Sequence, residues 1–191
     1  MEALFISTGV VALAEVGDKT QLLAFILAAR FKKPLPIIAG ILCATLINHG
    51  LAGVLGSWIT SVVSPEVMRW ALGLSFIGMA IWTMIPDKIE EEETRVAKHL
   101  GVFGATFITF FLAEMGDKTQ IATVALAAHY GAPLMVVIGT TLGMLVADVP
   151  AVFIGNKFAT KIPMKLVHSI AAGIFALMGL LTLLQVEKLF Q

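Results

Sequence analysis

The sequence has little charge and almost no cysteine. Only 14% of its 191 residues are charged, against about 25% in a soluble domain, and 58% are hydrophobic. The single cysteine, Cys43, excludes an internal disulfide, and its place in an apolar run is typical of a small core residue. The formal net charge is zero, so no basic excess points to nucleic acid. This composition indicates an integral membrane protein.

The start of the chain lacks a basic segment and a cleavage site, so we expect the first apolar run to be a retained helix. A transmembrane helix needs about 20 mostly apolar residues. Six stretches qualify: 4–29, 35–56, 67–86, 101–128, 134–155 and 166–185. The first and fourth exceed a minimal span, which fits a tilted helix, a break, or a helix that continues beyond the membrane. The prediction is an all-α protein with six transmembrane helices.

Lysine and arginine are distributed unevenly between the connections. Nine of the 13 lie in the first, third and fifth connections, and the opposite side has only Arg69 and Lys188. Basic connections stay in the cytoplasm. We therefore expect a multi-pass protein with both termini outside the cytoplasm.

One eight-residue motif occurs twice, 99 residues apart. It reads AEVGDKTQ at residues 14–21 and AEMGDKTQ at residues 113–120, with seven identical positions. Similarity at the same offset continues beyond it, for example from Pro34-Leu35 to Pro133-Leu134. Because each half holds three predicted spans, an odd number, the second half must enter the membrane from the opposite side. The sequence therefore predicts an inverted repeat with its substrate site between the repeats.

This repeat divides the chain into three parts. Residues 1–86 form repeat one and residues 100–191 form repeat two, each with three transmembrane helices. Residues 87–99 form an acidic cytoplasmic linker. A charge run of this kind is usually a solvated loop, and a cation-attracting role is the alternative.

The motif places acidic side chains inside apolar runs, where they are costly and usually functional. On a continuous helix, Glu15 and Asp18 share one face, and Glu114 and Asp117 repeat the arrangement. The two-fold relation would bring all four carboxylates together. Weaker ligand candidates nearby are Thr20, Gln21, Thr119 and Gln120. Such an oxygen-only set suits Mn²⁺, Ca²⁺ or Mg²⁺, and the lack of Cys and His in the motifs disfavours copper and zinc.

The motifs also carry Lys19 and Lys118, which reduce the charge of four carboxylates to −2. One divalent cation, or two protons, would neutralise that site. Crowded carboxylates favour proton uptake, so metal and protons should compete. The lysines either pair with the carboxylates when the cation is absent or extend away from them.

Four further residues have open alternatives. Asp148, inside the fifth span, is a candidate metal ligand or proton carrier. His49, its counterpart at the offset of 99, fits a proton relay or a packing role. Gly17 and Gly116 either allow the helix to unwind or allow close helix packing.

The doubled E-x-G-D-K-[ST] motif, on the first and fourth of six spans, resembles the small cation transporters with Golgi members in eukaryotes and MneA-type manganese exporters in bacteria. The resemblance covers the whole chain. It implies a cation/proton antiporter for Mn²⁺ or Ca²⁺, with Glu15, Asp18, Glu114 and Asp117 at the acidic positions. The short chain looks like a bacterial inner-membrane member, which favours manganese export. The expected partners are the divalent ion, protons and the lipid bilayer, with no cofactor.

Three other functions remain as alternatives. One is a Ca²⁺/H⁺ antiporter. Another is an intramembrane aspartyl protease with Asp18 and Asp117 as its dyad, which the adjacent lysines and additional glutamates disfavour. A passive channel is the third, and the inverted repeat favours alternating access over it. The sequence therefore predicts a transporter rather than an enzyme, without indicating its oligomeric state.

Overall fold

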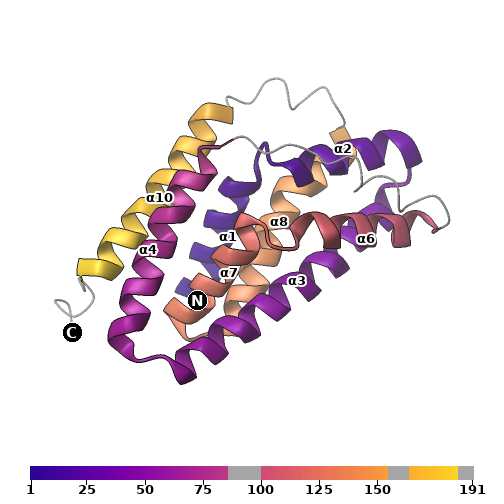
Figure 1. Cartoon of the computed structure of the whole chain (residues 1–191). Helices are drawn as coiled ribbons and strands as arrows, with labels where there is room; N and C mark the ends of the chain where they lie inside the picture. The colour runs from indigo at the N-terminus through magenta and orange to yellow at the C-terminus, as the bar shows by residue number, and fades with distance from the viewer. Residues whose placement is uncertain (86–99, 155–163, 185–191) are drawn as a thin grey trace.

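The computed structural model describes residues 1–85, 100–154 and 164–184, and the regular elements in these ranges are α-helices (Figure 1). They are α1 Glu2–Glu15, α2 Lys19–Phe31, α3 Pro34–Val62, α4 Pro65–Thr83, α6 Val102–Glu114, α7 Lys118–Tyr130, α8 Pro133–Ile154 and α10 Met164–Leu184. The predicted linker at residues 87–99 lies outside the described residues. Helices satisfy their own backbone hydrogen bonds, as an apolar environment requires.

The first and fourth predicted spans are each built from two short helices. α1 ends at Glu15 and α2 begins at Lys19, while α6 ends at Glu114 and α7 begins at Lys118. Of the three explanations for their length, the structure shows the break. Each half-helix has 13 or 14 residues. At about 1.5 Å per residue, such a helix is about 20 Å long, too short for a hydrocarbon core of about 30 Å.

Within the described ranges, two unbroken helices are long and apolar enough to cross a bilayer: α3, and α8 over Pro133–Phe153. α3, α4 and α8 begin with Pro34, Pro65 and Pro133. Proline suits the first turn of a helix because no intrahelical partner exists there for the missing N–H. These helices follow the predicted ranges closely, except that α3 continues to Val62.

The two halves of the sequence pack against each other through matched contacts. α1 packs against α8, and α6, its counterpart at the offset of 99, packs against α3. Both contacts use a glycine. A Cβ atom on Gly139 would lie 2.6 Å from the Leu4 carbonyl oxygen, and one on Gly40 would lie 3.0 Å from that of Phe103. Gly40 and Gly139, like Leu4 and Phe103, are 99 residues apart, so the same close approach occurs twice.

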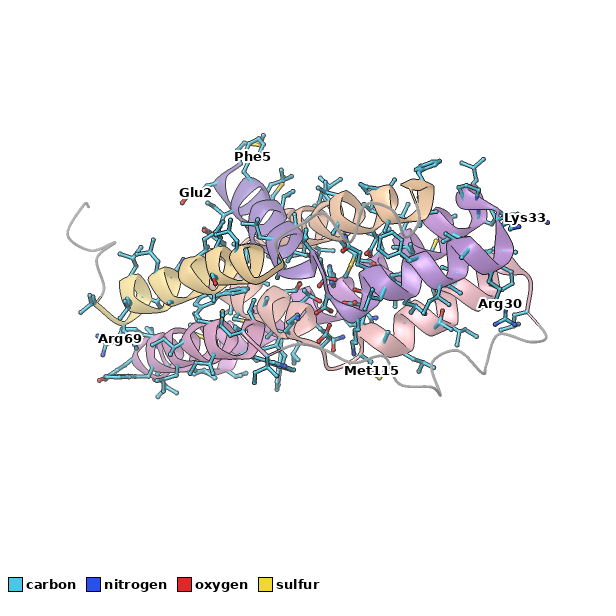
Figure 2. All side chains as sticks on the ribbon, turned by 90° about the horizontal axis from the view of Figure 1, so that it is seen from above. Glu2, Phe5, Arg30, Lys33, Arg69 and Met115 are labelled. Carbon is cyan, nitrogen blue, oxygen red and sulfur yellow. The ribbon has the colours of Figure 1, made fainter. Side chains whose placement is uncertain are left out.

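The interior is unusually polar and the exterior unusually apolar. Buried side chains include the acidic and threonine residues of both motifs together with Asn48, His49 and Asp148. Large apolar side chains such as Leu51 and Leu134 are exposed. Figure 2 shows side-chain oxygens gathered in the middle of the bundle, while Phe5 points outward. This distribution is expected when lipid surrounds the helices, because the bilayer accepts apolar groups and excludes charged ones.

Candidate metal site

The two helix breaks have nearly the same backbone conformation. Gly17 has a φ of 85° and Gly116 a φ of 77°. Across each break, an aspartate N–H donates to a glutamate carbonyl: Asp18 to Glu15 at 3.0 Å and Asp117 to Glu114 at 3.1 Å. Positive φ favours glycine. A Cβ atom on Gly116 would meet nothing within 4 Å, so unwinding rather than close packing explains this glycine.

The prediction that Glu15 and Asp18 share the face of a continuous helix is wrong, as it is for Glu114 and Asp117. Each glutamate is the last residue of one helix, and each aspartate is the N-cap of the next. The i, i+3 rule requires helical backbone between the two residues, and the left-handed glycine interrupts it.

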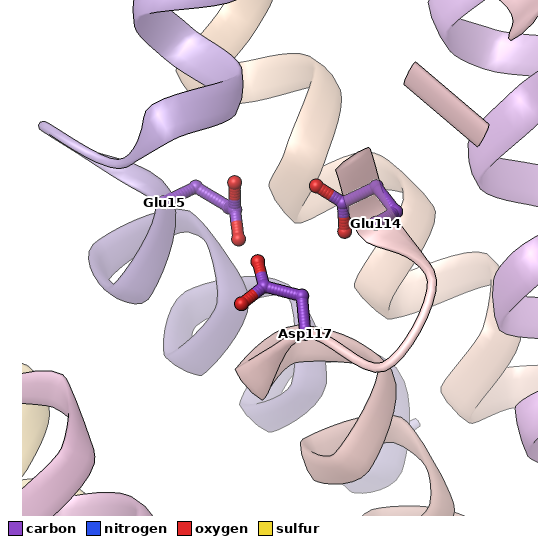
Figure 3. Close-up of side chains that lie close together, drawn as sticks. All are labelled: Glu15, Glu114 and Asp117. Carbon is purple, nitrogen blue, oxygen red and sulfur yellow. The ribbon is translucent and has the colours of Figure 1, made fainter. Parts of the chain in front are cut away.

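Three acidic side chains from the two motifs converge (Figure 3). One ligand oxygen each from Glu15, Glu114 and Asp117 lies within 4.8 Å of the other two, and all three residues are buried. They come from the end of α1, the end of α6 and the N-cap of α7. Three buried carboxylates at this separation can enclose a hard divalent cation. Asp18, the fourth predicted member, is outside this group.

Threonine hydroxyls hold both glutamates in the same way. Thr20 Oγ1 donates to Glu15 Oε2 at 2.7 Å, and Thr119 Oγ1 donates to Glu114 Oε2 at 2.8 Å. The Oε1 atom of each glutamate is buried and has no hydrogen-bond partner among the described residues. Buried polar atoms normally have partners, so these two oxygens are suited to accept a cation.

The amide oxygens of the two glutamines stabilise the breaks. Gln21 Oε1 accepts from the Gly17 N–H at 2.9 Å, and Gln120 Oε1 accepts from the Gly116 N–H at 2.7 Å. The threonine and glutamine candidates therefore support the carboxylates and the turns. Their own coordination of a metal stays a prediction.

The two lysines have different surroundings. Lys118 is buried and forms an ion pair with Asp18, which belongs to the other motif. Lys19 is half-buried and forms no ion pair with any described residue. The ion pair therefore joins the two repeats, which the spacing within one motif does not predict.

Asp148 and His49 are both buried. Neither Asp148 oxygen and neither His49 ring nitrogen has a hydrogen-bond partner among the described residues. Asp148 is close enough to Glu15 and Glu114 to interact electrostatically with both. It is not a member of the three-carboxylate group. A supporting role beside that group fits this position.

Asn48 is a further buried polar residue, and no motif in the sequence singles it out as a site residue. Its Nδ2 donates to the Phe111 carbonyl oxygen at 3.0 Å, three residues before Glu114. Its counterpart at the offset of 99, Ala147, accepts a hydrogen bond from Gln21 Nε2 at 3.0 Å. An amide inside an apolar run was the signal available in the sequence.

A family model described as "Divalent cation/proton antiporter GDT1" matches residues 3–91 and again 102–189. The chain belongs to the GDT1 family. GDT1 relatives include a Vibrio cholerae protein named "Putative manganese exporter", 52% identical over 95% of this chain and 90% of its own. "GDT1-like protein 3" of Oryza sativa subsp. indica is 30% identical over 91% of this chain and 71% of its own. No solved structure matches.

Membership in the GDT1 family makes the chain a membrane transporter of divalent cations. The names of the family and of its relatives point to a transporter rather than an enzyme. A hard divalent cation is also the substrate that the oxygen-only ligand group suits.

Proposed function

We propose that this chain exports Mn²⁺ in exchange for protons. The main support is the convergence of Glu15, Glu114 and Asp117 from the two motifs into one buried group. Mn²⁺ accepts carboxylate ligands, and protons bind the same oxygens. A site that either species can neutralise allows each to replace the other. The name of the Vibrio cholerae relative favours manganese and export.

The proposed architecture has six spans in two inverted repeats. Repeat one covers residues 1–86, the linker residues 87–99 and repeat two residues 100–191. The matched α1–α8 and α6–α3 contacts and the two similar helix breaks support a two-fold relation. The excess of Lys and Arg in three connections favours an orientation with both termini outside, and the Vibrio cholerae relative favours a bacterial cell-membrane protein.

In this proposal Glu15, Glu114 and Asp117 are the principal ligands. Asp148 holds a proton or contributes a ligand, because it interacts with both glutamates from outside their group. Asp18, Lys19 and Lys118 keep the net charge of the site low when the cation leaves, because the lysines can pair with carboxylates. Exchange of Mn²⁺ for protons requires that the binding site become accessible from each side of the membrane in turn, both with metal bound and with protons bound.

Purified protein in liposomes containing a pH-sensitive dye tests this function. External Mn²⁺ should drive proton movement, and Glu15→Gln or Glu114→Gln should each abolish it, because each removes a negative ligand from a shared site. Glu66→Gln is the matched control: this glutamate is exposed at the start of α4 and should leave the flux unchanged. Wild-type liposomes without metal-dependent proton flux would exclude the antiporter.

The same liposomes distinguish the two metal assignments. Mn²⁺ should compete with Ca²⁺ for entry, and the ion that saturates the flux at the lower concentration is the preferred substrate. Oxygen ligands bind both ions, so a preference for Ca²⁺ would replace manganese export by Ca²⁺/H⁺ exchange while retaining the site.

A further inference from the structure

Among the residues that the structure describes, the ion pair of the candidate site is formed on one side of the proposed two-fold relation and not on the other. Lys118 pairs with Asp18. The matched pair, 99 residues away in each case, would join Lys19 to Asp117. Lys19 forms no ion pair with any described residue, and Asp117 belongs to the three-carboxylate group. The two motifs, nearly identical in sequence, are therefore in different states.

A neutral hydrogen bond shows the same difference. Gln21 Nε2 donates to the Ala147 carbonyl oxygen across α2 and α8. The matched bond would run from Gln120 Nε2 to the Asn48 carbonyl oxygen. In the described part of the chain the Gln120 amide nitrogen donates no hydrogen bond. Both contacts that are formed involve residues of the first motif, Asp18 and Gln21.

α4 and α10 also pack unequally against the two pairs of half-helices. These two helices pack against each other and share an apolar cluster with α1 and α7. The matched helices α6 and α2 belong to a second cluster with α3 and α8, and α4 and α10 have almost no described contact with them. Figure 1 shows α4 and α10 beside α1 and α7, at the opposite side of the molecule from α2 and α6.

Matched aromatic residues show this difference at single positions. The Phe76 ring on α4 packs edge-to-face against the His129 ring on α7, with ring centroids 6.0 Å apart. The residues 99 positions away are Phe175 on α10 and Arg30 on α2. Phe175 is buried in the cluster around α1 and α7, while the Arg30 guanidinium lies over its neighbour Phe31.

We propose that α4 and α10 move as a pair, from packing against the half-helices α1 and α7 to packing against the half-helices α2 and α6. In the same movement the buried ion pair changes from Lys118–Asp18 to Lys19–Asp117. This inference rests on the proposed function and assigns the lysines a positioning role in it. In the second state, each contact that is formed on one side here is replaced by the contact between the matched residues, 99 positions away.

The exchange keeps the number of buried charges constant. In this structure Asp117 joins the glutamates while Lys118 covers Asp18. In the second state Asp18 joins them and Lys19 covers Asp117. Each state has three carboxylates for the substrate and one ion pair, so neither leaves an additional buried charge without compensation. With both termini outside, as proposed above, α1 and α7 form the outer half of the membrane region. Because α4 and α10 pack against this half, the outer side is the closed one in this proposal, and this structure is the inward-facing state.

Cross-linking with a short bifunctional thiol reagent tests the exchange in a Cys43→Ser background. Phe76→Cys with His129→Cys reports this state, and Arg30→Cys with Phe175→Cys reports the second. Lys118→Gln should shift the ratio of the two cross-links toward the second state by more than about tenfold, because it leaves Asp18 buried and unpaired. Lys19→Gln should shift it in the opposite direction.

A double variant distinguishes a shift between the two states from misfolding caused by Lys118→Gln alone. Asp18→Asn with Lys118→Gln leaves no unpaired charge at that pair and should give a smaller shift in the same direction. Shifts of both single lysine variants in the same direction, or no shift in either, would overturn the exchange. Metal-driven proton flux in the wild type is measured separately. Flux without lysine-dependent shifts overturns this inference alone, and shifts without flux overturn the proposed antiport alone.

Discussion

Each site glutamate uses one carboxylate oxygen for a threonine hydroxyl and keeps the other buried without a hydrogen-bond partner among the described residues. The hydroxyls orient the carboxylates while the free oxygens remain available to a cation. Removal of one such hydrogen bond usually costs about 0.5–1.5 kcal/mol.

Thr20→Val and Thr119→Val should therefore each weaken Mn²⁺ binding by about threefold to tenfold, because valine keeps the shape and loses the donor. Equilibrium binding by calorimetry measures this change. Thr60→Val is the control: Thr60 is exposed and its hydroxyl donates only to the Ser57 carbonyl oxygen. An unchanged affinity in both motif variants would show that the hydroxyls do not organise the site.

At the scale of elements, the helix break decides where the acidic side chains lie. Gly116 has positive φ and open space around its missing Cβ, so its requirement is conformational rather than steric. A residue with a Cβ atom costs about 1–2 kcal/mol in the left-handed region, and asparagine is tolerated better than most.

Gly116→Ala should lower thermal stability and reduce transport strongly, and Gly116→Asn should be less harmful. Gly9→Ala provides the control on a regular helix, since a Cβ there also meets nothing within 4 Å and alanine favours helix. Thermal unfolding in detergent and metal flux are the measurements. Equal effects of Gly116→Ala and Gly116→Asn would contradict a role for the left-handed conformation.

The contacts between the repeats depend on two other glycines. A Cβ on Gly40 would lie 3.0 Å from the Phe103 carbonyl oxygen and 2.7 Å from Thr106 Cβ, and one on Gly139 would lie 2.6 Å from the Leu4 carbonyl oxygen. Backbone atoms cannot move aside as a flexible side chain can, so these positions are overpacked by even one methyl group.

Gly40→Ala and Gly139→Ala should each destabilise the fold by about 1–3 kcal/mol. Gly50→Ala on α3 should have little effect, because nothing lies within 4 Å of its added Cβ. Unfolding of the three variants is compared under identical detergent conditions. If Gly50→Ala proved as destabilising as the other two, the close approach between repeats would not be the cause.

At the scale of the whole molecule, metal binding should be linked to stability and to pH. A ligand that binds only the folded state stabilises it by about 2.7 kcal/mol at 100 times its dissociation constant. Protons bind the same carboxylates, so lowering the pH occupies them and weakens metal binding.

Mn²⁺ should therefore raise the unfolding temperature of the wild type, and the increase should shrink as the pH falls. Glu114→Gln should show little increase at any pH, while Glu66→Gln should behave like the wild type. A Mn²⁺-dependent increase that is the same at all pH values would contradict competition between metal and protons.

Much of the candidate site could be proposed from the sequence, because its acidic residue types and their spacing are local features. Acidic groups inside apolar runs, repeated at a fixed offset, indicate Glu15, Glu114 and Asp117 without any tertiary information. The assignment of Asp18 to the same group came from a continuous-helix rule, and a single left-handed glycine removes the basis for that rule. Asn48 was missed because its partner is the Phe111 backbone carbonyl, which no side-chain pattern reveals.

The sequence by itself determined the apolar helices, the duplicated motif and an oxygen-rich ligand chemistry, since these follow from composition and short-range spacing. Only the tertiary structure decided that three carboxylates rather than four form one group, and that Lys118 pairs with Asp18 of the other motif. Local sequence cannot show this difference, because the two motifs have nearly the same sequence and local conformation. Their differences arise from contacts between residues 100 and 126 positions apart, to which short-range periodicity is insensitive.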